Sequence, residues 1–134
     1  MTRPARALVD TSVYIATESG RRLEVSALPE EWTASVVTLA ELTLGVLTAR
    51  DVASRSRRMG TLGLLDDVEL LGVTDVVAAE WARLRVQIVQ AGRRININDL
   101  WIGATAAAHG IPVVTQDADF DVLAEVGGIE VIRV

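Results

Sequence analysis

The chain has 134 residues, a formal net charge of −5 and 50% hydrophobic residues, which suits one folded domain and excludes a largely disordered protein. It has no cysteine. All 13 residues counted as lysine or arginine are arginines, and the single histidine is His109. This composition excludes disulfides, thiolate metal sites, lysine-dependent catalysis, chemistry that needs two histidines, and a basic domain that coats nucleic acid by charge alone.

Short apolar runs alternate with helical segments along the first half of the chain. Residues 7–9 predict a buried strand that ends at Asp10, and residues 12–19 predict a brief helix. A second strand is expected at 33–37. It is followed by predicted helices at 38–49 and 51–65.

The second half of the chain repeats this alternation. A strand is expected at 69–73, and Thr74 or Asp75 then caps a long helix that runs to Ala91. Asn98 is expected to cap a helix at 99–109. The remaining predicted elements are a strand at 112–115, a helix from Asp119 to 127–128 and a strand at 129–134.

Strands that alternate with helices predict an α/β fold with a parallel sheet covered by helices on both faces. The strands are short and continuously apolar, which is typical of strands that are buried on both sides. In such folds the functional crevice lies at the carboxyl ends of the strands.

No segment indicates export or membrane insertion. The first residues run directly into the strand at 7–9, and the apolar region at 100–114 is interrupted by polar residues, Gly110 and Pro112. We therefore expect a soluble cytoplasmic protein without a membrane segment.

Four acidic residues fall at strand ends or helix starts. Asp10 and Asp117 follow predicted strands, and Glu41 and Asp99 lie in the first turns of predicted helices. Each has an ordinary structural explanation: Thr38-x-x-Glu41 matches a capping box, and the other acids could cap helices or favour a helix dipole. Asp10 is the hardest to explain in this way, because an acid that ends a buried strand needs a partner.

If the sheet is parallel, these four carboxylates could all face one rim. Carboxylates that cluster without lysine repel one another, and a cation that neutralises them makes such a cluster tolerable. Oxygen ligands favour hard cations, chiefly Mg²⁺ or Mn²⁺. A cation of this kind activates water near a phosphate, so the pattern indicates phosphodiester hydrolysis that needs no histidine, cysteine or lysine.

With these acids in these positions, the sequence resembles the PIN-domain ribonucleases, and more narrowly the VapC-type toxins of bacterial toxin–antitoxin pairs. The matching segments keep the order and spacing of the family. They are residues 8–12 (LVDTS), 35–42 (SVVTLAEL) with Gly45, 97–106 (INDLWIGATA) and 112–120 (PVVTQDADF). The resemblance implies one PIN domain over residues 1–134, folded as a three-layer α/β/α sandwich around a central parallel sheet.

The resemblance also implies an activity and its partners. These are a Mg²⁺-dependent endoribonuclease, with Mn²⁺ as an alternative, an RNA substrate, a neutralising VapB-type antitoxin and a homodimer. Carried over by position, the catalytic and metal-binding acids would be Asp10, Glu41, Asp99 and Asp117, with Asp119 near enough to share the fourth role. A Mg²⁺-activated water would attack phosphorus in line and leave a 5′-phosphate and a 3′-hydroxyl. Hydroxyls of Thr11, Ser12 and Thr115 would orient the acids.

Two other functions compete with this interpretation. A receiver-like phosphoacceptor also gathers acids around Mg²⁺, but it conventionally uses a lysine, which this chain lacks. A catalytically degenerate PIN domain that only binds RNA or protein is the second alternative. All four acids are retained, which argues against it.

Overall fold

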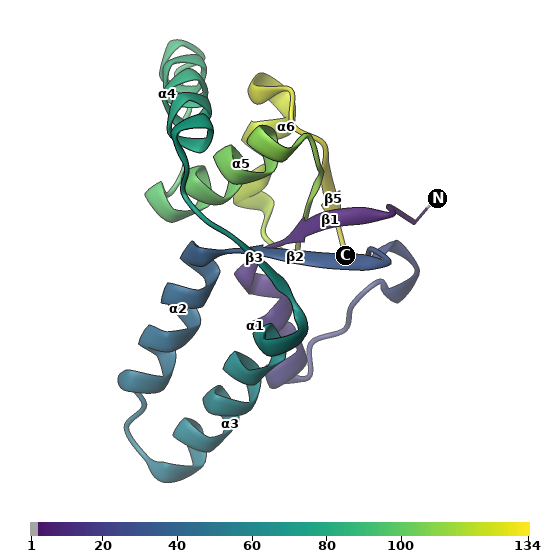
Figure 1. Ribbon diagram of the computed structural model, residues 1–134, viewed down its shortest axis with the longest axis vertical. Coiled ribbons are helices and arrows are strands. Elements are labelled where there is room, and N and C mark those ends of the chain that lie inside the picture. The colour runs from purple at the N-terminus through teal and green to yellow at the C-terminus, as the bar shows by residue number, and fades with distance from the viewer. Residues whose placement is uncertain (1–2) are drawn as a thin grey trace.

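The computed structural model describes residues 3–134 and contains a parallel sheet with helices on both faces (Figure 1). Within these residues the sheet has five strands in the order β3-β2-β1-β4-β5, and every neighbouring pair is parallel. The strands are β1 (Arg6–Val9), β2 (Glu31–Ser35), β3 (Glu69–Leu71), β4 (Val113–Thr115) and β5 (Val131–Arg133). Because all strands run the same way, their carboxyl ends share one edge, as the sequence pattern predicts.

Two helical layers enclose this sheet. One layer holds α1 (Thr11–Ser19), α2 (Val36–Leu47) and α3 (Val52–Gly63), and the other holds α4 (Asp75–Gln90), α5 (Ile97–His109) and α6 (Asp121–Gly127) (Figure 1). This arrangement confirms the predicted α/β/α sandwich. Among residues 3–134, none of the helices combines the length and apolar character needed to cross a membrane.

The alternation of side chains along β1 builds a core on each face of the sheet. Ala7 and Val9 pack with Tyr14 of α1 in one apolar cluster, whereas Leu8 packs with Leu84 of α4 in the other. All three strand residues are fully buried. Successive side chains of a strand point to opposite faces, so a short continuous apolar run serves both layers.

The boundary between β2 and α2 differs from the expectation. The predicted strand at 33–37 is wrong at its end, because β2 stops at Ser35 and α2 begins at Val36. The Ser35 hydroxyl caps the helix by accepting a hydrogen bond from the Val37 N–H at 3.0 Å. Thr38 therefore lies inside α2, and the expected capping box with Glu41 is wrong. The β-branched pair Val36 and Val37 favours a strand locally, but the serine cap prevails.

Smaller differences occur at other ends. Asn96, not Asn98, caps α5, since its side chain accepts a hydrogen bond from the Asn98 N–H at 2.9 Å. The predicted helix from Asp119 is a short 3₁₀ helix, η3 (Ala118–Phe120), which leads into α6 and is capped by Asp117. The strands predicted at 69–73 and 129–134 are each shorter, spanning the bounds of β3 and β5. None of these shifts moves an acidic residue away from the carboxyl edge of the sheet.

Candidate metal centre

Asp10 lies where β1 ends and caps α1. Its Oδ2 accepts hydrogen bonds from the Thr115 hydroxyl at 2.9 Å and from the Ser12 N–H at 3.2 Å. The residue is only 3% exposed. Burial raises the pKa of the Asp10 carboxyl, and the hydrogen bonds from Ser12 and Thr115 act in the opposite direction. The sequence pattern indicated that this acid needs a partner, and Thr115 of β4 supplies it.

Glu41 reaches the same region from α2. It lies on the second turn of the helix and is partly buried. Its Oε1 accepts a hydrogen bond of 2.8 Å from the hydroxyl of Thr11, the residue directly after Asp10. The start of α1 therefore holds both acids close together. Asp10 is the N-cap of this helix, and Thr11, its first residue, donates to Glu41.

Asp99 lies in the first turn of α5, as predicted, and carries the strongest sign of electrostatic crowding. Its pKa is raised to about 7, first by burial and then by the negative charges of Asp10, Asp117, Glu41 and Asp119, in that order. The structure therefore brings together the four acids that the sequence pattern selected, and Asp119, the alternative for the fourth role, lies near enough to Asp99 to act on its pKa.

The fourth acid and its neighbour follow β4. Carboxylate oxygens of Asp99, Asp117 and Asp119 all lie within 4.8 Å of one another. Both the backbone and the side chain of Asp117 are held by hydrogen bonds. Its N–H donates to Thr115 Oγ1 and its Oδ1 accepts from the Asp119 N–H, each at 2.9 Å. Asp119 is exposed, whereas Asp99 and Asp117 are partly buried. The sequence left open whether Asp119 shares the fourth position, and its carboxylate lies close enough to those of Asp99 and Asp117 for the three to hold one cation together.

The donor set of this cluster, Asp10, Glu41, Asp99, Asp117 and Asp119, fits a hard divalent cation. Every donor is a carboxylate oxygen, which Mg²⁺ and Mn²⁺ prefer to softer ligands. Within residues 3–134, no arginine forms an ion pair with any of the five acids. Their negative charge is therefore left for a cation to neutralise. The pKa of Asp99 is raised first by burial and then by repulsion from the neighbouring acids, and a bound cation would relieve that repulsion.

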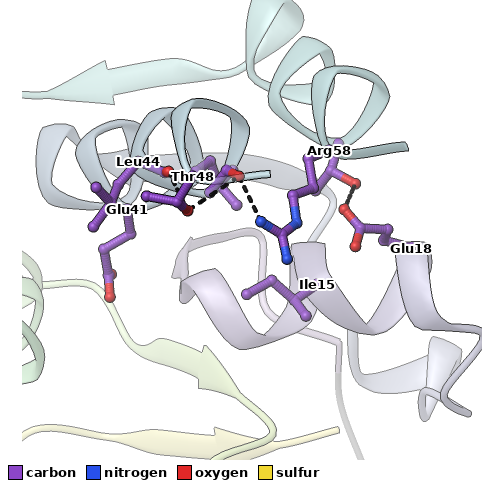
Figure 2. A pocket seen from close by; sticks show the side chains of 9 residues that line it. Ile15, Glu18, Glu41, Leu44, Thr48 and Arg58 are labelled. Carbon is purple, nitrogen blue, oxygen red and sulfur yellow. Dashed lines mark hydrogen bonds between the residues drawn. The ribbon is translucent and has the colours of Figure 1, made fainter. Parts of the chain in front are cut away.

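A cavity of about 380 Å³ extends from this centre between α1, α2 and α3. Figure 2 shows Glu41 at one end of its lining and Glu18 at the other, with Ile15 and Arg58 between them. Arg58 reaches from α3 to donate to the Gly45 carbonyl at 2.7 Å, and Glu18 accepts from the Thr61 hydroxyl at 2.7 Å. The cavity therefore joins an acidic centre to a mixed apolar and charged groove.

One polar residue of this region was not anticipated in its present role. Thr38 was interpreted as the first residue of a capping box, yet its hydroxyl lies 2.9 Å from that of Thr11. Ser35 is an equally good cap three residues earlier, and this competing signal is present in the sequence. The pairing with a residue of another helix has no local signal.

Comparison with known protein families gives a match over most of the chain. The PIN domain model matches residues 7–126. Among curated proteins, the chain is 50% identical to Ribonuclease VapC5 of Mycobacterium tuberculosis over 133 residues, which covers 99% of this chain and 98% of the relative. It is 45% identical to Ribonuclease VapC4 of the same organism over 121 residues, covering 90% and 93% of the two chains.

Solved structures agree with these relatives. A chain of the VapBC-5 toxin–antitoxin system from Mycobacterium tuberculosis superposes with a TM-score of 0.91 at 46% identity, covering 98% of this chain and all of that one. FitAcB from Neisseria gonorrhoeae superposes with a TM-score of 0.76 at 26% identity, covering 95% and 96%. VapBC2 from Rickettsia felis, at 20% identity and a TM-score of 0.78, shares the fold.

Proposed function

The chain belongs to the PIN-domain family of VapC ribonucleases, and we propose that residues 1–134 form one PIN domain that cleaves RNA by divalent-cation-dependent hydrolysis. The observation that carries this proposal is the cluster of five acids at the carboxyl edge of the sheet, none of them paired with an arginine within residues 3–134. Carboxylates alone suffice for this chemistry, which agrees with a chain that has one histidine and no cysteine.

Each acid has a distinct part in the proposed reaction. Asp10 and Asp99 would be the main cation ligands, because both are at least partly buried and their charges oppose each other most strongly. Glu41, Asp117 and Asp119 would complete the oxygen-rich rim. A divalent cation bound there would polarise phosphate oxygens and lower the pKa of a water molecule.

The hydroxyl groups around the acids hold them ready for the cation. Thr115 donates to Asp10 and accepts from the Asp117 N–H, so one side chain fixes two of the acids. The Ser12 hydroxyl accepts from the Gln116 N–H at 3.0 Å and thereby joins α1 to the segment after β4. Such fixed surroundings reduce the reorganisation that binding would otherwise require.

Regulation by an antitoxin follows from the relatives, since the matching structures are toxin–antitoxin systems. We propose that an antitoxin segment enters the cavity between α1, α2 and α3. Leu44 on its rim is 60% exposed, and Glu41 at its end belongs to the acidic centre, so an occupant would both bury apolar surface and cover the site. Glu18 and Glu41 favour an occupant that carries basic residues.

A substitution in the cavity tests this location. Leu44→Asp should weaken binding of the cognate antitoxin about 10-fold or more, because it places a charge in an apolar contact. RNA cleavage by the free protein should be unchanged. The matched control is Val86→Asp on α4, which alters a residue of similar exposure, 53%, on the opposite layer. Equal antitoxin binding by both variants would exclude the cavity as the docking site.

The activity itself is tested by incubating the purified chain with RNA and either Mg²⁺ or Mn²⁺. We expect cleavage that chelation of the cation stops and that Asp10→Ala and Asp99→Ala abolish. Asp75→Ala is the matched control, because Asp75 lies in the first turn of α4 as Asp99 does in α5. Water displaces the 3′ oxygen from phosphorus in this reaction, so the products should carry a 5′-phosphate and a 3′-hydroxyl.

Two results would overturn the proposal. Cyclic-phosphate ends would show that the 2′-hydroxyl attacks phosphorus, which needs no metal-activated water. Folded protein that binds RNA without cutting it in either cation would instead support a PIN domain that acts as a binding module.

A further inference from the structure

A buried threonine lies behind Glu41 on α2. Thr38 precedes Glu41 by one helical turn and is 0% exposed. Its Oγ1 lies 2.9 Å from Oγ1 of Thr11, the first residue of α1. Among residues 3–134 this hydroxyl has no other hydrogen-bond partner. Thr38 therefore contacts the start of α1 but is too deeply buried to touch a substrate.

The direction of these hydrogen bonds follows from counting protons. A hydroxyl group donates one hydrogen. The Thr11 hydroxyl donates its hydrogen to Glu41 Oε1 at 2.8 Å, so the bond between the two threonines must be donated by Thr38. The three side chains thus form a directed chain from Thr38 through Thr11 to Glu41, in which each bond polarises the next.

This series of hydrogen bonds restrains the Glu41 side chain, which would otherwise be flexible. Glu41 lies at the end of the cavity that also contains Arg58, a cation that could draw the carboxylate away from the other acids. In Figure 2 the Glu41 side chain instead lies apart from the Arg58 guanidinium, which is engaged with the Gly45 carbonyl. Oε1 of Glu41 accepts the hydrogen bond from Thr11, and within residues 3–134 no hydrogen bond is made to the second oxygen, which leaves that oxygen for a ligand.

We propose that Thr38 is a positioning residue that fixes the Glu41 carboxylate for cation binding by acting through Thr11. This inference rests on the proposed function, because it assigns Glu41 to the cation site. Thr38 is fully buried, so replacing its hydroxyl by a methyl group of similar size, as in Thr38→Val, leaves Thr11 without its donor and leaves no space for water.

The test compares threonine variants of the full chain. Thr38→Val and Thr38→Ala remove the hydroxyl, and Thr38→Ser keeps it. Thr33→Val is the matched control, because Thr33 is also fully buried but donates to the Ala7 carbonyl within the sheet. The readouts are binding of Mn²⁺ alone, measured by electron paramagnetic resonance, the melting temperature, and RNA cleavage in Mg²⁺.

We expect Thr38→Val and Thr38→Ala to bind Mn²⁺ about 10-fold more weakly than the wild type, which is the usual scale for a group that orients a ligand. Thr38→Ser should restore the affinity to within about 2-fold. Thr33→Val should lower the melting temperature as much as Thr38→Val does but leave Mn²⁺ affinity unchanged. Cleavage by the hydroxyl-free variants should require correspondingly more Mg²⁺.

The outcomes separate this inference from the proposed function. If the wild type cleaves RNA and Thr38→Val binds Mn²⁺ as Thr33→Val does, the positioning role is wrong and the ribonuclease function stands. If the wild type does not cleave but loss of the hydroxyl selectively weakens Mn²⁺ binding, the positioning role stands and the function is wrong. Equal impairment in Thr38→Ser and Thr38→Val would also overturn the positioning role, since packing would then explain the effect.

Discussion

The two sides of the acidic cluster are held in different ways. On the side of α1 and α2, Asp10 and Glu41 each accept a hydrogen bond from a threonine hydroxyl. On the side of α5, the Asp99 carboxylate accepts no hydrogen bond from residues 3–134, and its pKa is raised to about 7. One side is thus fixed by donors before a cation arrives, whereas the other holds negative charge that only a cation or a proton relieves. Substitutions on the two sides should therefore differ in their effects on stability.

The largest effect is expected for catalysis by Asp99→Asn. The amide keeps the shape of the side chain but removes the charge that would hold the cation, so cleavage should fall at least about 100-fold, a scale typical of losing one preorganised electrostatic group. Single-turnover cleavage of an RNA substrate in Mg²⁺ measures this. Full activity in this variant would exclude Asp99 from the cation site.

The hydroxyl side is tested by Thr115→Val. Asp10 is buried and loses a donor, so the variant should be less stable by about 1–3 kcal/mol and should bind Mg²⁺ about 10-fold more weakly. Thr105→Val is a suitable control, because Thr105 is buried on α5 and, within the part of the chain that the structure describes, its hydroxyl bonds only to the Trp101 carbonyl, at 2.8 Å. Denaturant unfolding and calorimetry measure both quantities. An Mg²⁺ affinity equal to that of Thr105→Val would remove the distinction between the two sides.

On the charged side, the Asp99 carboxylate destabilises the cation-free folded protein, whereas the hydroxyl groups on the other side stabilise it. The folded-state pKa of Asp99, about 7, lies above its ordinary value of 3.8, so the folded protein keeps a proton that the unfolded chain has already released. Without a cation, the free energy of unfolding should fall as pH rises from about 4 to 7 and then level off. The raised pKa of Asp10 acts in the same direction. Below about pH 4 both states are protonated and the effect vanishes.

Asp99→Asn should remove most of this pH dependence and stabilise the cation-free protein by about 1–2 kcal/mol above pH 7, after allowance for screening by solvent. Urea unfolding in the presence of a chelator, repeated from pH 4 to 8, measures the change. If the cation-free variant were less stable than the wild type at pH 8, the negative charge of Asp99 would not destabilise the folded protein.

The smallest effect is expected at Asp119. It is exposed, so solvent screens its charge, and Asp119→Asn should raise the Mg²⁺ concentration for half-maximal cleavage only about 3-fold. Asp66→Asn is matched to it, because Asp66 is also exposed and lies in the first turn of a 3₁₀ helix, η2 (Leu64–Asp67). If Asp119→Asn had no more effect than this control, Asp117 alone would fill the fourth position.

The sequence predicted the layers of the fold because continuous apolar runs such as 7–9 and 112–115 favour strands that are buried on both faces. The element ends were less predictable where two capping residues compete. Ser35 and Thr38 are both good helix caps, as are Asn96 and Asn98, and in each case the earlier residue accepts the hydrogen bond. Local preference does not decide between such neighbours, because packing of the helix against the sheet fixes where it begins.

The acids of the site could be predicted because strand ends and helix starts share one edge of a parallel sheet. Their supporting contacts could not be predicted in the same way. Thr38 and Thr11 are 27 residues apart, and Thr115 and Asp10 are 105 apart. Such pairs depend on how α2 and β4 lie against the start of α1, which no local pattern specifies.

The most direct test of the central claim, that the five acids form one cation site governed by Asp99, is proton release on cation binding. At pH 7 about half of the Asp99 carboxyls should be protonated in the cation-free protein, and the cation displaces that proton. Calorimetric titration with Mg²⁺ in two buffers of different ionisation enthalpy should therefore show release of about half a proton per ion at pH 7, and clearly less at pH 9 or in Asp99→Asn. Equal proton release by the wild type and Asp99→Asn, or no Mg²⁺ binding by the wild type, would contradict the claim.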